Sequence, residues 1–253
     1  MTPRYLQEIL EARGSRLRPP RPAACPPPRD FRTALAARPI AIVAEIKIAS
    51  PSKGVLLGDR DPAQLARTYA EHGAAAISVV TEETRFLGSM DLLRVVRDAT
   101  DRPVLRKDFL TSDDDVDESV AWGASAILLI ARILDGEALD RLVARAESRG
   151  IAAVVEVHDE DDVCKARRAG ARLYGVNNRN LESFEVSLSV SEELGPLLPA
   201  HSVRIAESGI GGPEDIRRLH RAGFTSFLVG ESLISSPDPG ALLDRLAGAL
   251  ACA

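Results

Sequence analysis

The stretch IAIVAEIK at residues 40–47 decides the fold, because it begins as a buried strand and ends in charges. Its first five residues are apolar, as in a strand covered on both faces. Glu45 and Lys47 follow two residues apart, so their side chains project to the same side of the strand. Two charges there need each other or a ligand as partners, since an unpaired buried charge is very costly.

Similar apolar runs recur after residue 40 and alternate with amphipathic stretches, which is typical of parallel strands joined by crossover helices. The pattern predicts eight strands, near 40–46, 76–80, 103–106, 126–130, 152–157, 173–176, 203–207 and 226–229. A chain of 253 residues could hold two small domains or one barrel. Eight βα units without a long break favour a single α/β fold, a closed (β/α)8 TIM barrel, over an open doubly wound sheet, which stays an alternative.

The first 39 residues differ in composition and predict an N-terminal extension (1–39) ahead of a barrel catalytic domain (40–253). Tyr5 to Ala12 could form a short helix. The stretch RPPRPAACPPPR at 18–29 then contains six prolines. Proline fixes φ and removes backbone donors, so this stretch should be an extended connector.

Composition argues against several classes of partner. The formal net charge of -5 provides no basic surface for nucleic acid, and no run approaches the roughly 20 apolar residues of a membrane span. The N-terminus lacks the apolar stretch of a signal peptide, and the three scattered cysteines form no C-x-x-C pair. The four histidines show no metal-ligand spacing. We therefore expect a cytoplasmic protein without a metal site.

Polar residues interrupt the later strands near their carboxyl ends, where barrels gather their active sites. They are Lys107, Glu156, Asn177, Asn178, Arg179, Glu207 and Ser208. Any one of them could be a solvated loop residue or part of a structural ion pair, but together they predict one concave site. Lysines and glutamates in such a site shift one another's pKa values, which makes acid and base roles available. His158 follows Glu156 and could touch a ligand, although a loop histidine is more often solvated.

Glycine-rich turns follow the last two predicted strands, ESGIGG at 207–212 and LVGES at 228–232. Glycine lets backbone N–H groups approach an anion, and barrels often bind phosphate with these loops. The turns therefore predict a small phosphorylated substrate.

These motifs resemble those of the indole-3-glycerol-phosphate synthase family of tryptophan biosynthesis. The matching stretches are AEIKIASPSKG (44–54), FLGSMDL (86–92), PVLRKDF (103–109), VEVHDE (155–160), GVNNRNL (175–181), ESGI (207–210) and VGESL (229–233). They follow the family's order and cover nearly all the chain after residue 40. The resemblance implies a carboxy-lyase that converts 1-(2-carboxyphenylamino)-1-deoxyribulose 5-phosphate to indole-3-glycerol phosphate, carbon dioxide and water, with no cofactor and no metal.

The resemblance also implies four catalytic residues. Lys107 would be the general acid that protonates the ketone oxygen, and Glu156 the general base of the dehydration. Lys47 would hold the substrate carboxylate and could donate the second proton. Glu45 would position Lys47 and tune it.

Further positions match the family's binding residues. Those implied to contact the substrate are Asn177, Arg179, Glu207, Phe86 and Phe109, although phenylalanines in such runs often belong to a core. Those implied to bind phosphate are Ser50, Ser208, Gly209, Gly230 and Glu231, the last three through backbone N–H groups. The chain departs from the family at Ile48, where a basic residue is common, and in its proline-rich segment, which replaces part of a polar helix that helps cover the site.

Three other interpretations compete with this one. A phosphoribosylanthranilate isomerase would share the phosphate loops but would rely on a cysteine and aspartate pair, whereas the first strand here ends with Glu45 and Lys47. A non-catalytic phosphate-binding subunit would normally have lost part of the acid and base set, and a paralogue in specialised metabolism would keep the same chemistry. We expect a monomer or weak homodimer, compatible with association with other tryptophan-pathway enzymes, and no nucleic-acid or membrane partner.

Overall fold

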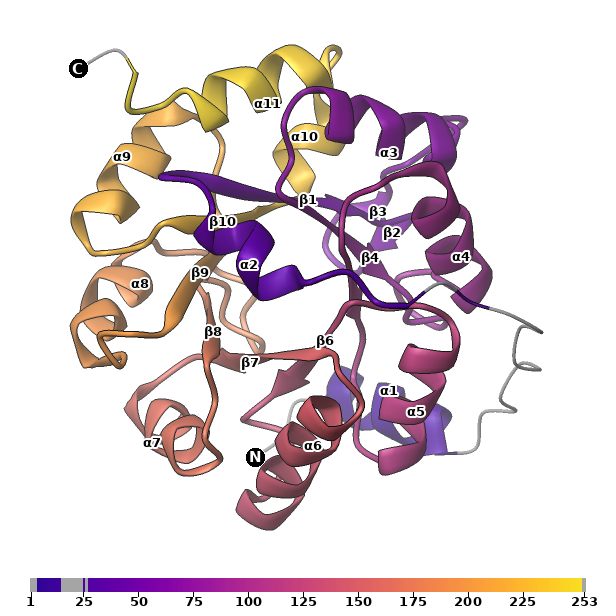
Figure 1. Cartoon of the computed structure of the whole chain (residues 1–253), viewed down its shortest axis with the longest axis vertical. Helices are drawn as coiled ribbons and strands as arrows, with labels where there is room; N and C mark the ends of the chain where they lie inside the picture. Colours follow the sequence, from indigo (N-terminus) through magenta and orange to yellow (C-terminus); the bar gives the residue numbers. More distant parts are fainter. Residues whose placement is uncertain (1–3, 15–24, 26, 252–253) are drawn as a thin grey trace.

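A computed structural model describes residues 4–14, 25 and 27–251. Its eight long strands are parallel and close into a barrel in the order β1, β10, β9, β8, β7, β6, β5, β4 (Figure 1). The closed barrel confirms the predicted (β/α)8 architecture and excludes the open sheet.

The elements alternate as the sequence predicted. The barrel strands are β1 (Ala41–Ile46), β4 (Ala76–Val80), β5 (Val104–Lys107), β6 (Ala126–Ile130), β7 (Ala152–Val157), β8 (Leu173–Asn177), β9 (Val203–Glu207) and β10 (Ser226–Val229). The surrounding helices are α3 (Pro62–Glu71), α4 (Met90–Ala99), α5 (Asp113–Ala121), α6 (Gly136–Ser148), α7 (Glu160–Arg168), α8 (Ser189–Leu194), α9 (Pro213–Arg221), α10 (Glu231–Ser235) and α11 (Pro239–Ala247). A short hairpin, β2 (Ala49–Ser50) and β3 (Gly54–Val55), lies in the loop after β1, and a 3-10 turn (Gly195–Leu197) follows α8.

Side-chain caps fix where the helices begin. Asp61 accepts a hydrogen bond from the Ala63 N–H at 3.0 Å, and the next residue is the proline that opens α3. Ser112 begins α5 in the same way, and the following acidic residues occupy its first turn. Negative charge is stabilised at that end of a helix, so the acidic run needs no metal to explain it.

Period-two alternation divides the strand residues between two apolar layers. In β1, Ile42, Ala44 and Ile46 pack outward in the large cluster between sheet and helices. Ala41 and Val43 point into the barrel. The interior cluster contains Phe31, Leu35, Ala41, Val43, Ala75, Ala76, Leu105, Ala126, Leu128, Ile130, Val154, Leu173, Ile205 and Leu228.

Helix α2 (Phe31–Ala36) closes the end of the barrel where the strands begin. Asp30 caps it by accepting from the Thr33 N–H at 2.9 Å. Phe31 and Leu35 lie four residues apart, so both point from one face of the helix into the barrel, and each is only 1% exposed. This end is therefore filled with apolar side chains.

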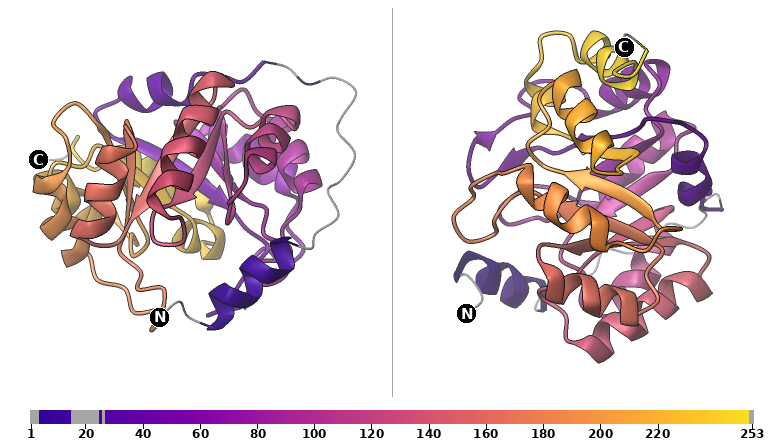
Figure 2. Two further views of the ribbon diagram at one scale, coloured as in Figure 1. Left: turned by 90° about the horizontal axis from the view of Figure 1, so that it is seen from below. Right: turned by 90° about the vertical axis from the view of Figure 1, so that its left-hand side faces the viewer.

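Helix α1 (Arg4–Gly14) lies at the opposite end, where the sequence predicted a short helix (Figure 2). Arg13 forms ion pairs with Asp108 at 2.7 Å and Asp115 at 3.0 Å, and these anchor the helix beside the loop that follows β5. The predicted connector at 18–29 lies largely outside the described residues. Among the helices that the structure describes, none combines the length and apolar character that a membrane span requires.

Candidate active site

A cavity of about 470 Å³ opens at the carboxyl ends of the barrel strands. The residues predicted from the sequence that line it are Glu45, Lys47, Ser50, Phe86, Lys107, Phe109, Glu156, Asn177, Arg179, Glu207, Ser208, Gly209, Gly230 and Glu231. Asn178 does not line it; its buried side-chain amide donates to the carbonyls of Glu207 and Ser208 instead. The fold thus brings together residues from seven separate segments of the chain, as expected if the polar residues near the carboxyl ends of the strands form one site.

Every second side chain of a barrel strand points inward, and these inward columns of side chains explain the convergence. On β7, Val154 fills the barrel interior and Glu156 follows two residues later on the same face. On β9, Ile205 and Glu207 repeat the arrangement. Each column changes from apolar to charged only at its last inward position, where the cavity begins.

Two glycines make room for the buried carboxylates. A Cβ on Gly175 would lie 2.1 Å from Oε1 of Glu207, and one on Gly230 would lie 2.4 Å from Oε1 of Glu45. Any larger residue at either position would displace a site glutamate. Gly230 therefore has a local packing role whether or not its N–H binds an anion.

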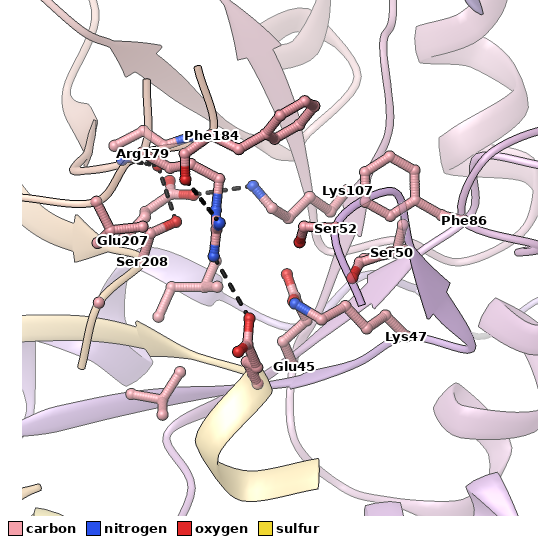
Figure 3. A pocket seen from close by; sticks show the side chains of 18 of the residues that line it. Glu45, Lys47, Ser50, Ser52, Phe86, Lys107, Arg179, Phe184, Glu207 and Ser208 are labelled. Carbon is pink, nitrogen blue, oxygen red and sulfur yellow. Dashed lines mark hydrogen bonds and ion pairs between the residues drawn. The ribbon is translucent and has the colours of Figure 1, made fainter. Parts of the chain in front are cut away.

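Lys107 lies at the centre of the site, and its Nζ donates to Glu207 at 2.9 Å and to Glu156 at 3.2 Å (Figure 3). Burial alone would lower the pKa of Lys107, but the carboxylates of Glu207, Glu156 and Glu45 outweigh burial and raise it. Its side chain is 20% exposed to the cavity, so the ammonium stays charged within reach of a ligand.

The two glutamates that share Lys107 have different pKa values. Burial, followed by the nearby carboxylates, raises the pKa of Glu207 to about 7 against the opposing effect of Lys107. For Glu156, burial acts in the same direction, but Lys107 and His158 overcome it and lower the pKa. Near neutral pH, Glu156 is therefore an ionised carboxylate, whereas Glu207 exchanges between its protonated and ionised forms.

Lys47 and Glu45 pair with each other, which is one of the two possibilities that their spacing left open. Lys47 Nζ donates to Glu45 Oε1 at 2.7 Å, and the glutamate side chain is 4% exposed. Burial would raise the pKa of Glu45, but Lys47 and then Lys107 lower it. Figure 3 shows Lys47 beside Ser50 and Ser52, across the cavity from Glu207 and Ser208.

Asn177 ties the end of β8 to the turn after β9. Its Oδ1 accepts from the Ser208 hydroxyl at 2.9 Å and from the Arg179 N–H at 3.0 Å. Ser208 and Gly209 both have positive φ, 65° and 82°, which turns the chain sharply at the cavity wall. A glycine suits the second of these positions because it adopts a left-handed conformation without steric cost.

Glu231 borders the cavity with its side chain as well as with its backbone. Its carboxylate lies 3.4 Å from Arg179 Nη2 and 3.7 Å from Lys53 Nζ, and Lys53 belongs to the turn between β2 and β3. Lys53 is 58% exposed on its side chain, so this ion pair lies at the rim.

Two aromatic pairs border the opening. Phe86 and Phe109 have ring centroids 6.4 Å apart, and Tyr5 and Phe184 are 5.1 Å apart. Sequence reasoning found the first pair and missed the second. Tyr5 reaches the cavity only because α1 packs across this end of the barrel, and no local pattern signals that packing.

Glu82 organises the loop that carries Phe86. Its buried carboxylate accepts from the N–H groups of Thr84 at 2.8 Å, Arg85 at 2.7 Å and Phe86 at 2.9 Å. The Phe86 carbonyl in turn accepts from the Ala49 N–H at 3.1 Å. One carboxylate therefore fixes both the phenylalanine and the start of the β2–β3 hairpin.

Two other residues noted in the sequence, His158 and Ile48, lie outside the cavity lining. His158 has a side chain only 5% exposed, so it is not solvated. Ile48 packs half-buried against the outer core and accepts from the N–H groups of Leu56 and Leu57 through its carbonyl. Across the described ranges, no group of three His, Cys, Asp or Glu side chains is arranged to hold a metal ion.

A closed barrel whose cavity gathers two lysines and three buried glutamates is typical of enzymes that use acid–base chemistry. Comparison with known proteins narrows this class. A sequence profile of the indole-3-glycerol phosphate synthase family matches residues 10–246, and the chain belongs to that family.

Individual relatives agree. The chain is 50% identical over 202 residues to indole-3-glycerol phosphate synthase of Kineococcus radiotolerans, which covers 80% of this chain and 74% of the relative. It is 47% identical over 222 residues to the same-named protein of a Nocardioides species, covering 88% and 85%. Among solved structures, 3-hexulose-6-phosphate synthase from Salmonella typhimurium superposes with a TM-score of 0.68 at 12% identity, covering 84% of this chain and 99% of that one, which reflects the barrel fold alone.

Proposed function

We propose that this chain is an indole-3-glycerol-phosphate synthase, the carboxy-lyase that closes the indole ring of 1-(2-carboxyphenylamino)-1-deoxyribulose 5-phosphate. Membership of the family supports the reaction. The single observation that carries the assignment to this site is Lys107 held between Glu156 and Glu207 inside the cavity.

The first step would form the carbon–carbon bond. The ring carbon that bears the carboxylate attacks the ketone carbon, and Lys107 protonates the ketone oxygen as its charge develops. Loss of carbon dioxide returns the bonding electrons to the ring and restores its aromaticity. Lys47, paired with Glu45, is well placed to hold the substrate carboxylate until it leaves.

The second step would remove water. Glu156 takes a proton from the ring-closed intermediate while the hydroxyl departs with a proton from Lys47. The lowered pKa of Glu156 keeps it ionised and able to accept that proton. Asn177, Arg179 and Glu207 would orient the substrate's hydroxyl and carboxylate groups.

The binding regions would divide the substrate between them. Ser50, Ser208, Gly209, Gly230 and Glu231 would hold the phosphate, with backbone N–H groups as donors at the last three. The opening between Phe86 and Phe109 would take the aromatic ring, which stacks favourably on phenylalanine.

A product assay tests the proposal directly. We expect the purified protein, with chelator present and no nucleotide added, to generate indole fluorescence from the carboxyphenylamino sugar phosphate. Absence of product from folded protein would contradict the proposed function. In Glu156→Gln we expect dehydration to slow by about 10²- to 10⁴-fold, because a general base has been removed, so a decarboxylated intermediate accumulates.

The finer predictions from the sequence are proposals too. They are a cytoplasmic location, a monomer or weak homodimer, association with other tryptophan-pathway enzymes, and the division into an extension (1–39) and a catalytic barrel (40–253). Light scattering on the purified protein tests the oligomeric state. Rescue of a tryptophan auxotroph separates the primary pathway from specialised metabolism.

A further inference from the structure

His158 lies between two carboxylates, those of Glu156 and Asp162. Its Nε2 is 3.3 Å from Glu156 Oε1, and its Nδ1 is 3.6 Å from Asp162 Oδ2. The three side chains are 5%, 2% and 6% exposed. Neither ring nitrogen has a well-aligned hydrogen-bond partner in the described part of the chain, so the imidazole is a buried polar group with carboxylates on two sides.

The start of α7 fixes this imidazole. Asp162 accepts from the backbone N–H of His158 at 3.1 Å, and its own N–H donates to the cap residue Asp159 at 2.9 Å. Arg132, from the loop after β6, pairs with Asp159 and lies 3.6 Å from Asp162 Oδ2. Asp162 is therefore held from three directions, and it holds the histidine at the end of β7.

A nitrogen-bearing side chain faces each oxygen of Glu156. Lys107 contacts Oε2 at 3.2 Å, and His158 faces Oε1 at 3.3 Å. Asn177 adds a side-chain hydrogen bond. The other titratable groups that interact with Glu156 are Tyr5 on α1, Glu45 on β1 and Glu207 on β9.

These contacts make the state of Glu156 depend on both neighbours. Burial favours the neutral acid, whereas Lys107 and then His158 lower its pKa. In the proposed reaction Lys107 donates its proton before dehydration begins. From then until it is reprotonated, the imidazole of His158, 3.3 Å from Oε1, is the neighbour of Glu156 that can still carry a positive charge.

We propose that His158 is a positioning residue that orients Oε1 of Glu156 and keeps this carboxylate ionised while Lys107 is without its proton. The inference rests on the proposed function. A histidine serves here because its imidazolium can donate to both carboxylates at once, whereas neutral imidazole can donate to only one.

The test is the pH profile of His158→Asn. Asparagine keeps a donor of similar size but has no charge, and an opposite charge within about 4–6 Å typically shifts a carboxyl pKa by about 1 unit or more. Glu156 should then protonate at higher pH. We expect the acid limb of kcat to move up by about 1 pH unit, with KM nearly unchanged and more decarboxylated intermediate at low pH.

Two further variants exclude a merely structural effect. His72→Asn is the matched control, because that imidazole pairs with Asp244 at 2.8 Å on the outer helices, and its pH profile should overlay the wild type. In the Glu156→Gln background, His158→Asn should cause no further loss. If His158→Asn does not fold, His158→Gln is measured in its place.

The outcomes separate the two proposals. Folded wild-type protein that makes no product overturns the proposed function. Active wild type together with a His158→Asn acid limb that coincides with it overturns the role of His158 and leaves the proposed function standing. Full additivity of His158→Asn with Glu156→Gln also overturns the positioning role.

Discussion

The two ends of the barrel use the same inward columns of side chains for opposite purposes. At the end where the strands begin, Phe31 and Leu35 from α2 fill the space and are each 1% exposed. At the other end, Lys107 and its two carboxylates surround an open cavity. One or two inward positions per strand separate a packed core from a charged site, so truncating a core side chain and removing a site side chain should have different effects on stability and activity.

The largest expected effect is on activity, from Lys107→Ala. Loss of a general acid typically costs 10²- to 10⁴-fold, and we expect kcat/KM for product formation to fall by about that factor. A cooperative unfolding transition should survive, because the interior cluster is untouched. Activity within ten-fold of the wild type would contradict the assignment of Lys107.

Phe31→Ala should have the opposite pattern. Truncating a buried phenylalanine typically costs about 3–5 kcal/mol, so we expect urea unfolding to show a loss of that size with kcat unchanged. Phe184→Ala, at the cavity, is the matched variant and should raise KM with a much smaller loss of stability. If both variants affected activity and stability alike, the two ends would not be independent.

Glu207→Gln should link the site to stability through pH. The raised pKa means that Glu207 binds a proton more tightly in the folded protein than in the unfolded chain, where its pKa is the ordinary 4.5. The stability that the folded state gains from this proton is therefore lost as pH rises from about 4.5 to about 7. Glutamine removes this loss, worth on the order of 3 kcal/mol. We expect the variant to gain stability over wild type in urea at pH 8 but not at pH 4, and an equal difference at both pH values would refute the raised pKa.

Lys53→Ala should have the smallest effect. Its contact with Glu231 is at the exposed rim, and exposed ion pairs contribute about 0–1 kcal/mol. We expect unfolding free energy within about 1 kcal/mol of wild type and a few-fold rise in KM that disappears at high salt. A large loss of kcat would instead place Lys53 among the reacting groups.

The barrel could be predicted from sequence because its signals are local. Apolar runs and turn residues gave strand ranges at 76–80, 126–130, 152–157, 203–207 and 226–229 that coincide with the observed strands. The site followed from the same periodicity, since a charge at the last inward position of a parallel strand must meet the charges of its neighbours. Glu45 and Lys47 illustrate this, because two charges on the same side of a buried strand need a partner, and the two side chains pair with each other.

Contacts between distant segments could not be predicted in this way. Arg106 lies in β5 next to Lys107 and is fully buried, paired with Asp108 and with Glu118 on α5. Tyr5 reaches the cavity only through the docking of α1, far along the chain from the other residues of the site. Such placements depend on tertiary packing, which no short window of sequence contains.

The anchoring of α1 sets an order of events for the pocket. Arg13 and Asp115, which hold the helix in place, are 102 positions apart along the chain. Joining such distant segments has a loop-closure cost, so this wall should assemble after the local βα units have formed. A helix that packs across one end of a barrel is also released before the closed sheet opens. On gentle heating, the protein's affinity for substrate should therefore fall while the barrel is still folded.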